Sequence, residues 1–129
     1  MTDDPSAKLA QTAWDAVACA DAETLTHICS KDIVWHAPGR GPRAGEFRGL
    51  EAVLDHLRSV GEAAERFSSQ PVAVLGGEDR AAVVFHATGE RCGRVLDYDA
   101  VLLFRVEDRR IAEIWSVPFD QRAVDEFWA

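Results

Sequence analysis

The segment over residues 95–117 constrains the fold more than any other part of the chain. It has the pattern of two long strands joined by a tight charged turn at residues 107–110, and the first strand carries four consecutive apolar residues, 101–104. A strand with one buried face alternates apolar and polar side chains, so this run predicts apolar contacts on both faces of the sheet. We therefore expect a β-hairpin near the centre of the fold.

The charges of Arg105 and Glu113 indicate which face of this hairpin is less buried. Side chains alternate between the two faces of a strand, and a central charge marks the face nearer to solvent. The opposite face, which we expect to form the floor of a pocket, carries Tyr98, Ala100, Leu102, Phe104, Ala112, Ile114 and Ser116. The charged face also carries Val101, Leu103, Trp115 and Val117. That surface is too apolar to be fully hydrated, so we expect a homodimer through this outer sheet face.

The rest of the chain places helices before strands. Helical spacing of apolar residues predicts a first helix starting at Asp4 and Pro5, a second over 22–29 and a third over 50–64. Strand patterns follow at 72–75, 81–88, 95–106 and 111–117, after a short strand or extended segment at 32–36, and Asp120 is placed to begin a last helix. This order predicts an α+β fold in a single domain over residues 1–129, with helices packed on one face of a curved antiparallel sheet.

Composition excludes several classes of partner. The net charge of -8 would repel nucleic acid, and no apolar run approaches the ~20 residues of a membrane span. Three cysteines without CxxC spacing indicate reduced thiols in a cytoplasmic protein, with Cys19 and Cys29 as small core residues. His27 and His56 project off the apolar stripes and are expected at the surface. No metal-ligand spacing and no phosphate-binding or dinucleotide motif occurs, so we expect no cofactor and no metal.

The order of elements, together with WHAPGRGPRAGEFRG at 35–49 and VLLFRVEDRRIAEIW at 101–115, resembles the SnoaL-like branch of the nuclear transport factor 2-like superfamily, which includes the ketosteroid isomerases. The resemblance covers nearly the whole chain. It implies a cone-shaped, cystatin-like roll in which helices close a bent sheet around an apolar cavity. It also implies dimers through the outer sheet face. The many aromatic residues suit a small, flat hydrophobic guest of polyketide, steroid or terpenoid type.

The residues at three positions argue against ketosteroid isomerase chemistry. Against the isomerase pattern, Trp14 stands at the helix tyrosine, Leu102 at the strand aspartate and Ala37 at the aspartate base. An indole donates only a weak hydrogen bond, and the side chains of leucine and alanine neither donate nor accept one. We therefore expect a pocket without that catalytic machinery.

Three other residues are candidates for chemistry. His36 lies beside the position of the isomerase base and can act as general acid or base, or it can hold the neighbouring loop as a structural histidine. Tyr98 can donate to a carbonyl oxygen from the pocket floor, or its hydroxyl can lie in water at the rim. Asp99 is held in reserve, because a bulge would turn it inward, whereas regular alternation pairs it with His86 on the outer face.

The remaining candidates are ligand-binding residues. We expect the pocket to be lined by Trp14, Val17, Trp35, Leu54, Leu57, Phe85, Leu102, Phe104, Ile114, Ser116 and Phe119. Arg40, Arg43 and Arg48 flank the glycine-proline loop, where they either meet an acidic ligand or are solvated.

These observations support three hypotheses of function. The leading one is a cofactor-independent isomerase, cyclase or dehydratase that moves a proton on a small hydrophobic molecule. The alternative is a non-catalytic ligand-binding or dimerisation module of the same fold. An epoxide hydrolase-like reaction is a further alternative, and it requires Asp97 or Asp99 inside the cavity.

Overall fold

The computed structural model of the chain describes residues 5–19, 21–40, 44–63 and 66–129. Helices α1 (Pro5–Cys19), α2 (Ala22–Ile28) and α3 (Leu50–Ala63) precede the long strands, and α4 (Gln121–Trp128) follows them. The strands are β1 (Cys29–Ala37), β2 (Gly45–Arg48), β3 (Arg66–Gly77), β4 (Arg80–Arg91), β5 (Arg94–Glu107) and β6 (Arg110–Pro118). The predicted α+β order is confirmed. Asp4 and Ala64, the expected ends of two helices, lie outside the described residues.

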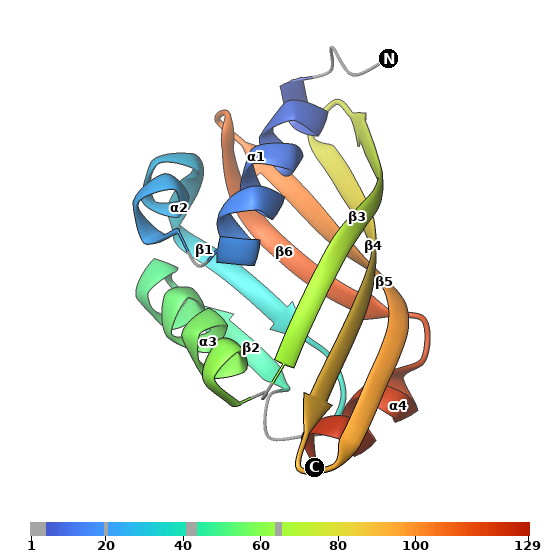
Figure 1. Cartoon of the computed structure of the whole chain (residues 1–129). Helices are drawn as coiled ribbons and strands as arrows, with labels where there is room; N and C mark the ends of the chain where they lie inside the picture. Colours follow the sequence, from blue (N-terminus) through green and yellow to red (C-terminus); the bar gives the residue numbers. More distant parts are fainter. Residues whose placement is uncertain (1–4, 20, 41–43, 64–65) are drawn as a thin grey trace.

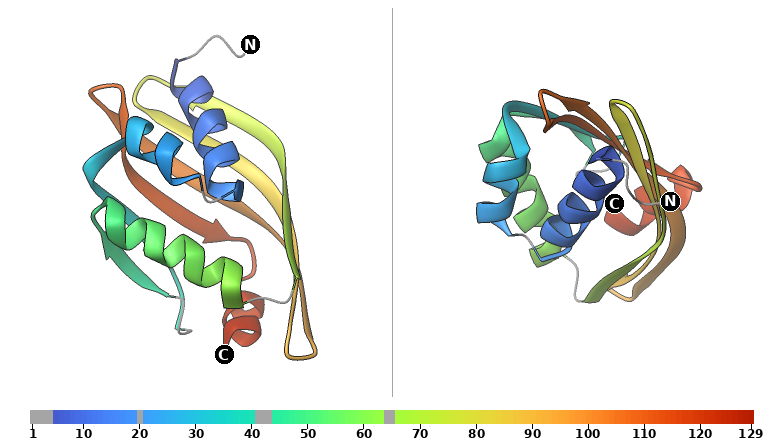
Figure 2. Two further views of the ribbon diagram at one scale, coloured as in Figure 1. Left: turned by 60° about the vertical axis from the view of Figure 1, so that its left-hand side comes forward. Right: turned by 90° about the horizontal axis from the view of Figure 1, so that it is seen from above.

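One six-stranded sheet runs in the order β2-β1-β6-β5-β4-β3. The meander β3-β4-β5-β6 is antiparallel as predicted, whereas β1 pairs with β6 in parallel. The sheet bends around α1, α2 and α3, which cover its concave side (Figures 1 and 2). In the described part of the chain, no helix combines the length and apolar character needed to cross a membrane.

The central hairpin forms as its sequence predicts. Asp108 and Arg109 have φ values of 52° and 65°. Positive φ at both central residues is what a two-residue type I′ hairpin turn requires. Leu102 and Phe104 of β5 are 2% and 1% exposed, whereas Leu103 between them is 41% exposed. The buried and exposed faces of the hairpin are therefore the ones that the alternation of side chains predicted.

Strands β2 and β3 differ most from the sequence prediction. Strand β2 pairs with β1 through residues 45–48, a segment predicted only to lead into a helix. Its single large apolar side chain, Phe47, stands between polar residues and glycines and gives little local signal. Strand β3 begins at Arg66, not at residue 72, because an edge strand tolerates Pro71 at an irregularity in the register between Pro71 and Ala73.

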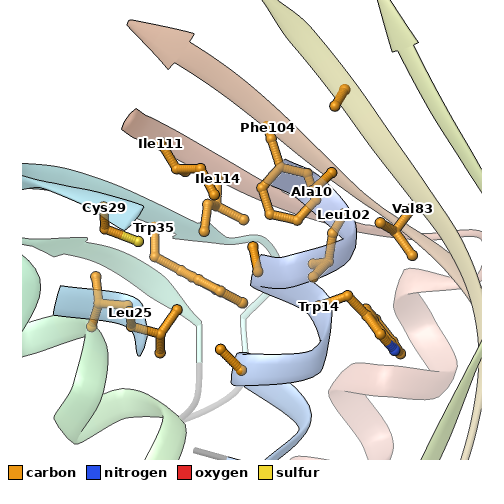
Figure 3. Packing of buried hydrophobic residues seen from close by; sticks show 14 of the residues in the cluster. Ala10, Trp14, Leu25, Cys29, Trp35, Val83, Leu102, Phe104, Ile111 and Ile114 are labelled. Carbon is orange, nitrogen blue, oxygen red and sulfur yellow. The ribbon is translucent and has the colours of Figure 1, made fainter. Parts of the chain in front are cut away.

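The main core lies between α1 and the concave face of the sheet. Ala10, Ala13 and Trp14 of α1 are at most 5% exposed. The Trp14 ring packs against Phe85 of β4, with centroids 4.8 Å apart. Figure 3 shows Phe104 and Ile114 beside α1, and Trp35 entering the same cluster from β1. Helices α2 and α4 are capped by aspartates, since Asp21 accepts from the Thr24 N–H and Asp120 from the Ala123 N–H.

The cysteines differ in accessibility. Cys29 is 2% exposed at the start of β1, and burial raises the pKa of its thiol to about 12. Cys19 is exposed, which corrects the prediction that it belongs to the core; it is the last residue of α1 and lies beyond Ala16, the last buried residue of that helix.

Thiol labelling should separate these cysteines. Because Cys19 and Cys92 are exposed and Cys29 is buried, a disulfide reagent should react rapidly with two thiols per native chain and with the third only after unfolding. Rapid reaction of all three in the native protein would contradict the placement of Cys29.

Candidate active site

A cavity of about 560 Å³ lies between the end of α1, helices α3 and α4, and the concave face of the sheet. Among the residues predicted to bind a ligand, those that line it are Trp14, Val17, Trp35, Leu57, Phe85, Leu102 and Ser116. Tyr98, predicted as a catalytic residue, lines it too. Ala37 lines it as well, so the three positions where ketosteroid isomerases keep polar groups, Trp14, Leu102 and Ala37, all face the cavity. The structure therefore contains the predicted cavity, and the side chains at these three positions form mainly apolar parts of its wall.

Four predicted wall residues lie elsewhere. Phe104 and Ile114 are each 1% exposed and belong to the core, and Leu54 packs partly buried against that core. Phe119 is 67% exposed. Ser116 and Pro118 line the cavity, so alternation turns Phe119 to the other side. The prediction that Phe119 lines the pocket is therefore wrong.

Tyr98 is the phenol of the cavity. Its ring meets Phe85 edge-on, with centroids 6.3 Å apart, and burial raises the pKa of its hydroxyl to about 12. The hydroxyl therefore keeps its proton over the physiological range. It is suited to donate a hydrogen bond to a carbonyl oxygen or to a developing negative charge.

His36 lies on the outer face of the sheet. Its neighbours Trp35 and Ala37 line the cavity, and alternation directs His36 away from it. The Nε2 of His36 donates to Glu113, and its ring stacks on Trp115 with centroids 5.2 Å apart. Glu113 also accepts from Arg105 Nε at 3.1 Å. Burial opposes ionisation of Glu113, but the hydrogen bonds from His36 and Arg105 prevail and lower the pKa of its carboxyl.

His86 and Asp99 form the cross-strand pair that regular alternation predicts. They are register partners in β4 and β5, and His86 Nδ1 lies 2.9 Å from Asp99 Oδ1. Asp97 approaches the other ring nitrogen at 3.0 Å. Both carboxylates lie on the outer face of the sheet. The epoxide hydrolase-like alternative requires one of them inside the cavity, so the structure does not support it.

The pairing of His86 with Asp99 should make the stability of the fold depend on pH. The hydrogen bond to Asp99, followed by the charges of both aspartates, raises the pKa of His86 above its ordinary value of 6.5. A raised folded-state pKa stabilises the fold below the unfolded pKa, and this contribution disappears as pH rises through the folded pKa. Asp99→Asn should therefore lower the pKa of His86 in an NMR titration and lower the stability at pH 5.5 but not at pH 9. An unchanged His86 titration would refute the pairing.

The sequence prediction for His56 was wrong, and the structure makes this residue a candidate for function. It is 8% exposed and lines the cavity, although it was expected at the surface. Phe47 of the unpredicted strand β2 stacks on its ring, with centroids 4.0 Å apart and planes at 23°. Trp35 lies 6.0 Å away on a tilted plane. Because β2 covers this side of α3, a residue off the main apolar stripe becomes buried.

Helix α4 and the loop after β1 form the polar border of the cavity. Gln121 Nε2 donates to Pro38 O at 3.2 Å and to Asp125 Oδ1 at 3.0 Å, while the Arg40 N–H donates to the same carboxylate oxygen at 3.1 Å. Gly39 has a φ of 108°, and a Cβ there would lie 2.2 Å from Asp125 Oδ1. Glycine at position 39 therefore permits the close approach of the loop to α4.

The arginines near this loop have different surroundings. Arg48 forms an ion pair with Glu46, and the Arg40 side chain is exposed. Arg43 lies outside the described residues. Within the described ranges, no group of three or more histidine, cysteine, aspartate or glutamate residues is arranged to hold a metal ion.

Comparison with known proteins identifies the family. The family model for the SnoaL-like domain matches residues 10–114. The chain belongs to the SnoaL-like family. An uncharacterised Mycobacterium tuberculosis protein is 30% identical to this SnoaL-like chain over 131 residues, covering all of both proteins.

Solved structures support the same fold. Bal32a, from a soil-derived mobile gene cassette, is 28% identical, covers 97% of each chain and superposes with a TM-score of 0.90. A proposed SnoaL-like polyketide cyclase from Jannaschia sp. CCS1 is 16% identical, covers 96% of this chain and 91% of its own, and has a TM-score of 0.80. The SnoaL-like chain therefore has the nuclear transport factor 2-like, cystatin-like fold that its sequence predicts.

Proposed function

We propose that this SnoaL-like protein catalyses proton transfer on a small hydrophobic molecule, as an isomerase, cyclase or dehydratase. The observation that carries the proposal is the cavity of about 560 Å³, in which aromatic walls surround a phenol and an imidazole. Ligand sites in proteins are typically concave and apolar, with a few polar groups that orient the guest and carry the chemistry. Tyr98 is the hydrogen-bond donor in this proposal.

The aromatic walls favour a flat guest. Trp14, Trp35 and Phe85 present ring surfaces from α1, β1 and β4 toward one space. Flat rings of a polyketide-, steroid- or terpenoid-like molecule can stack on such surfaces or meet their edges. The guest therefore combines an apolar ring system with one oxygen that accepts from Tyr98.

The test is a thermal-shift screen of neutral ring ketones and their hydroxylated relatives, followed by mass and NMR analysis of each binder after incubation. A raised melting temperature together with conversion of the compound supports the proposal. Binding by none of a broad set of such compounds would count against it.

A non-catalytic ligand-binding module is the second candidate. It is favoured by Trp14, Leu102 and Ala37, which face the cavity where ketosteroid isomerases carry their catalytic groups. Tight binding in the same screen with no conversion of any bound compound would support the module over the enzyme.

We propose in addition that two copies associate through the outer sheet face. Leu103 and Val117 are each 41% exposed there, beside Trp115. Leu103→Glu would place a charge within this apolar surface, so the variant should sediment as a monomer while the parent sediments as a dimer at micromolar concentration. A parent that sediments only as a monomer would contradict this association.

A further inference from the structure

We propose that His56 is the catalytic residue that moves the proton, and that its substrate is a flat, neutral ketone with an acidic C–H next to the carbonyl. This inference rests on the proposed function, because it names the acting group and the substrate class of the same cavity. The sequence made His36 the candidate acid or base, but His36 lies on the outer face of the sheet, whereas His56 lines the cavity.

The position of His56 suits a reacting group. The residue lines the cavity although it is only 8% exposed, so little of its surface meets bulk water. Phe47 stacks on one face of the ring at 4.0 Å between centroids, and Trp35 lies against it at 6.0 Å. Packing of this kind fixes the plane of the imidazole before a substrate arrives, which is a requirement for efficient proton transfer.

The other ionisable groups of the cavity are less suited to take a proton. Among the described lining residues these are Tyr98 and Asp125. Burial raises the pKa of Tyr98 to about 12, so it remains a donor. One oxygen of Asp125 already accepts from the Arg40 N–H and from Gln121, which ties this carboxylate to the border of the cavity. An imidazole, in contrast, ordinarily exchanges protons near neutral pH.

The step is a proton transfer without change of oxidation state. A ring nitrogen of His56 takes the proton from the carbon, and the electron pair of the broken C–H bond forms the enolate, whose oxygen accepts from the Tyr98 hydroxyl. The imidazolium then returns a proton to carbon. Return to the same carbon regenerates the ketone, and return to a conjugated carbon produces an isomer.

Deuterium exchange into 2-tetralone tests this step. This two-ring ketone is neutral, one of its rings is aromatic and flat, and its C1 hydrogens are activated by both the carbonyl group and the aromatic ring. In D2O, ¹H NMR should show that the native protein accelerates loss of the C1 signal over the protein-free rate. His56→Gln should reduce this acceleration at least ~100-fold, the usual contribution of a general base, while tryptophan fluorescence shows that tetralone still binds. His27→Gln, at an exposed position of α2, is the matched control and should exchange at the native rate.

The outcomes separate this inference from the function on which it rests. Full exchange in His56→Gln would overturn the role of His56, as would loss of exchange in His36→Gln or Asp125→Asn with His56→Gln unaffected. Binding of tetralone by the native protein without accelerated exchange would overturn the inference and favour the ligand-binding module. Absence of tetralone binding would overturn the substrate class named here, and it would contradict the proposed function only together with a thermal-shift screen that finds no ligand. If His56→Gln does not fold, His56→Phe retains an aromatic ring against Phe47 and takes its place in the same assay.

Discussion

Phe104→Ala is expected to lower the free energy of unfolding by about 3–5 kcal/mol, the usual effect of removing a buried phenylalanine side chain. Phe104 is 1% exposed and lies in the main core beside α1 (Figure 3). The substitution removes most of the side chain and leaves a cavity that the strands around it fill only in part. Urea denaturation followed by circular dichroism measures the change.

The matched control is Phe119→Ala. Phe119 directly follows β6 and is 67% exposed, so its truncation should change stability by no more than about 0.5 kcal/mol. Equal effects of the two substitutions would contradict the facing assigned to β5 and β6.

Tyr98→Phe is expected to reduce turnover ~100- to 1000-fold, the usual effect of removing one donor to a developing oxyanion. The ring and its contact with Phe85 remain, so the affinity for the apolar part of the substrate should change little. Steady-state kinetics on a compound identified by the screen measures both quantities. Unchanged turnover would exclude Tyr98 as the donor.

The state of this hydroxyl can be measured independently of any substrate. Tyr98 is the single tyrosine of the chain, so the tyrosinate absorbance near 295 nm reports on it alone. The native protein should titrate at about 12, above the ordinary value of 10 that the urea-unfolded chain should show. A native pKa at the ordinary value would show that the hydroxyl is in water.

Local sequence pattern predicted the central hairpin because the information is contained in neighbouring residues. Leu102 and Phe104 alternate with Leu103 and Arg105, and strand geometry then fixes which of them face the core. The parallel pairing of β1 with β6 has no such signal, since Trp35 and its partner Ile114 are 79 positions apart in the sequence. The antiparallel meander was therefore predictable and the complete sheet was not.

The division of one sheet face between core and cavity also exceeds what local pattern contains. Leu102 and Phe104 share a face, yet only Leu102 lines the cavity. Phe104 is covered by α1, and alternation does not reveal where along the strands a helix will lie. His56 was missed for a related reason, because the side chain that covers it comes from β2, whose short segment has almost no strand signal.

The four tryptophans provide the most direct test that the cavity is the ligand site. Trp14, Trp35 and Trp128 line it, whereas Trp115 lies on the outer face against His36. A ¹H–¹⁵N spectrum resolves their indole N–H signals, which single Trp→Phe variants assign. On titration with 2-tetralone, the signals of Trp14, Trp35 and Trp128 should shift and that of Trp115 should not. A shift confined to Trp115 would contradict the account, because it would place the bound molecule on the opposite face of the sheet.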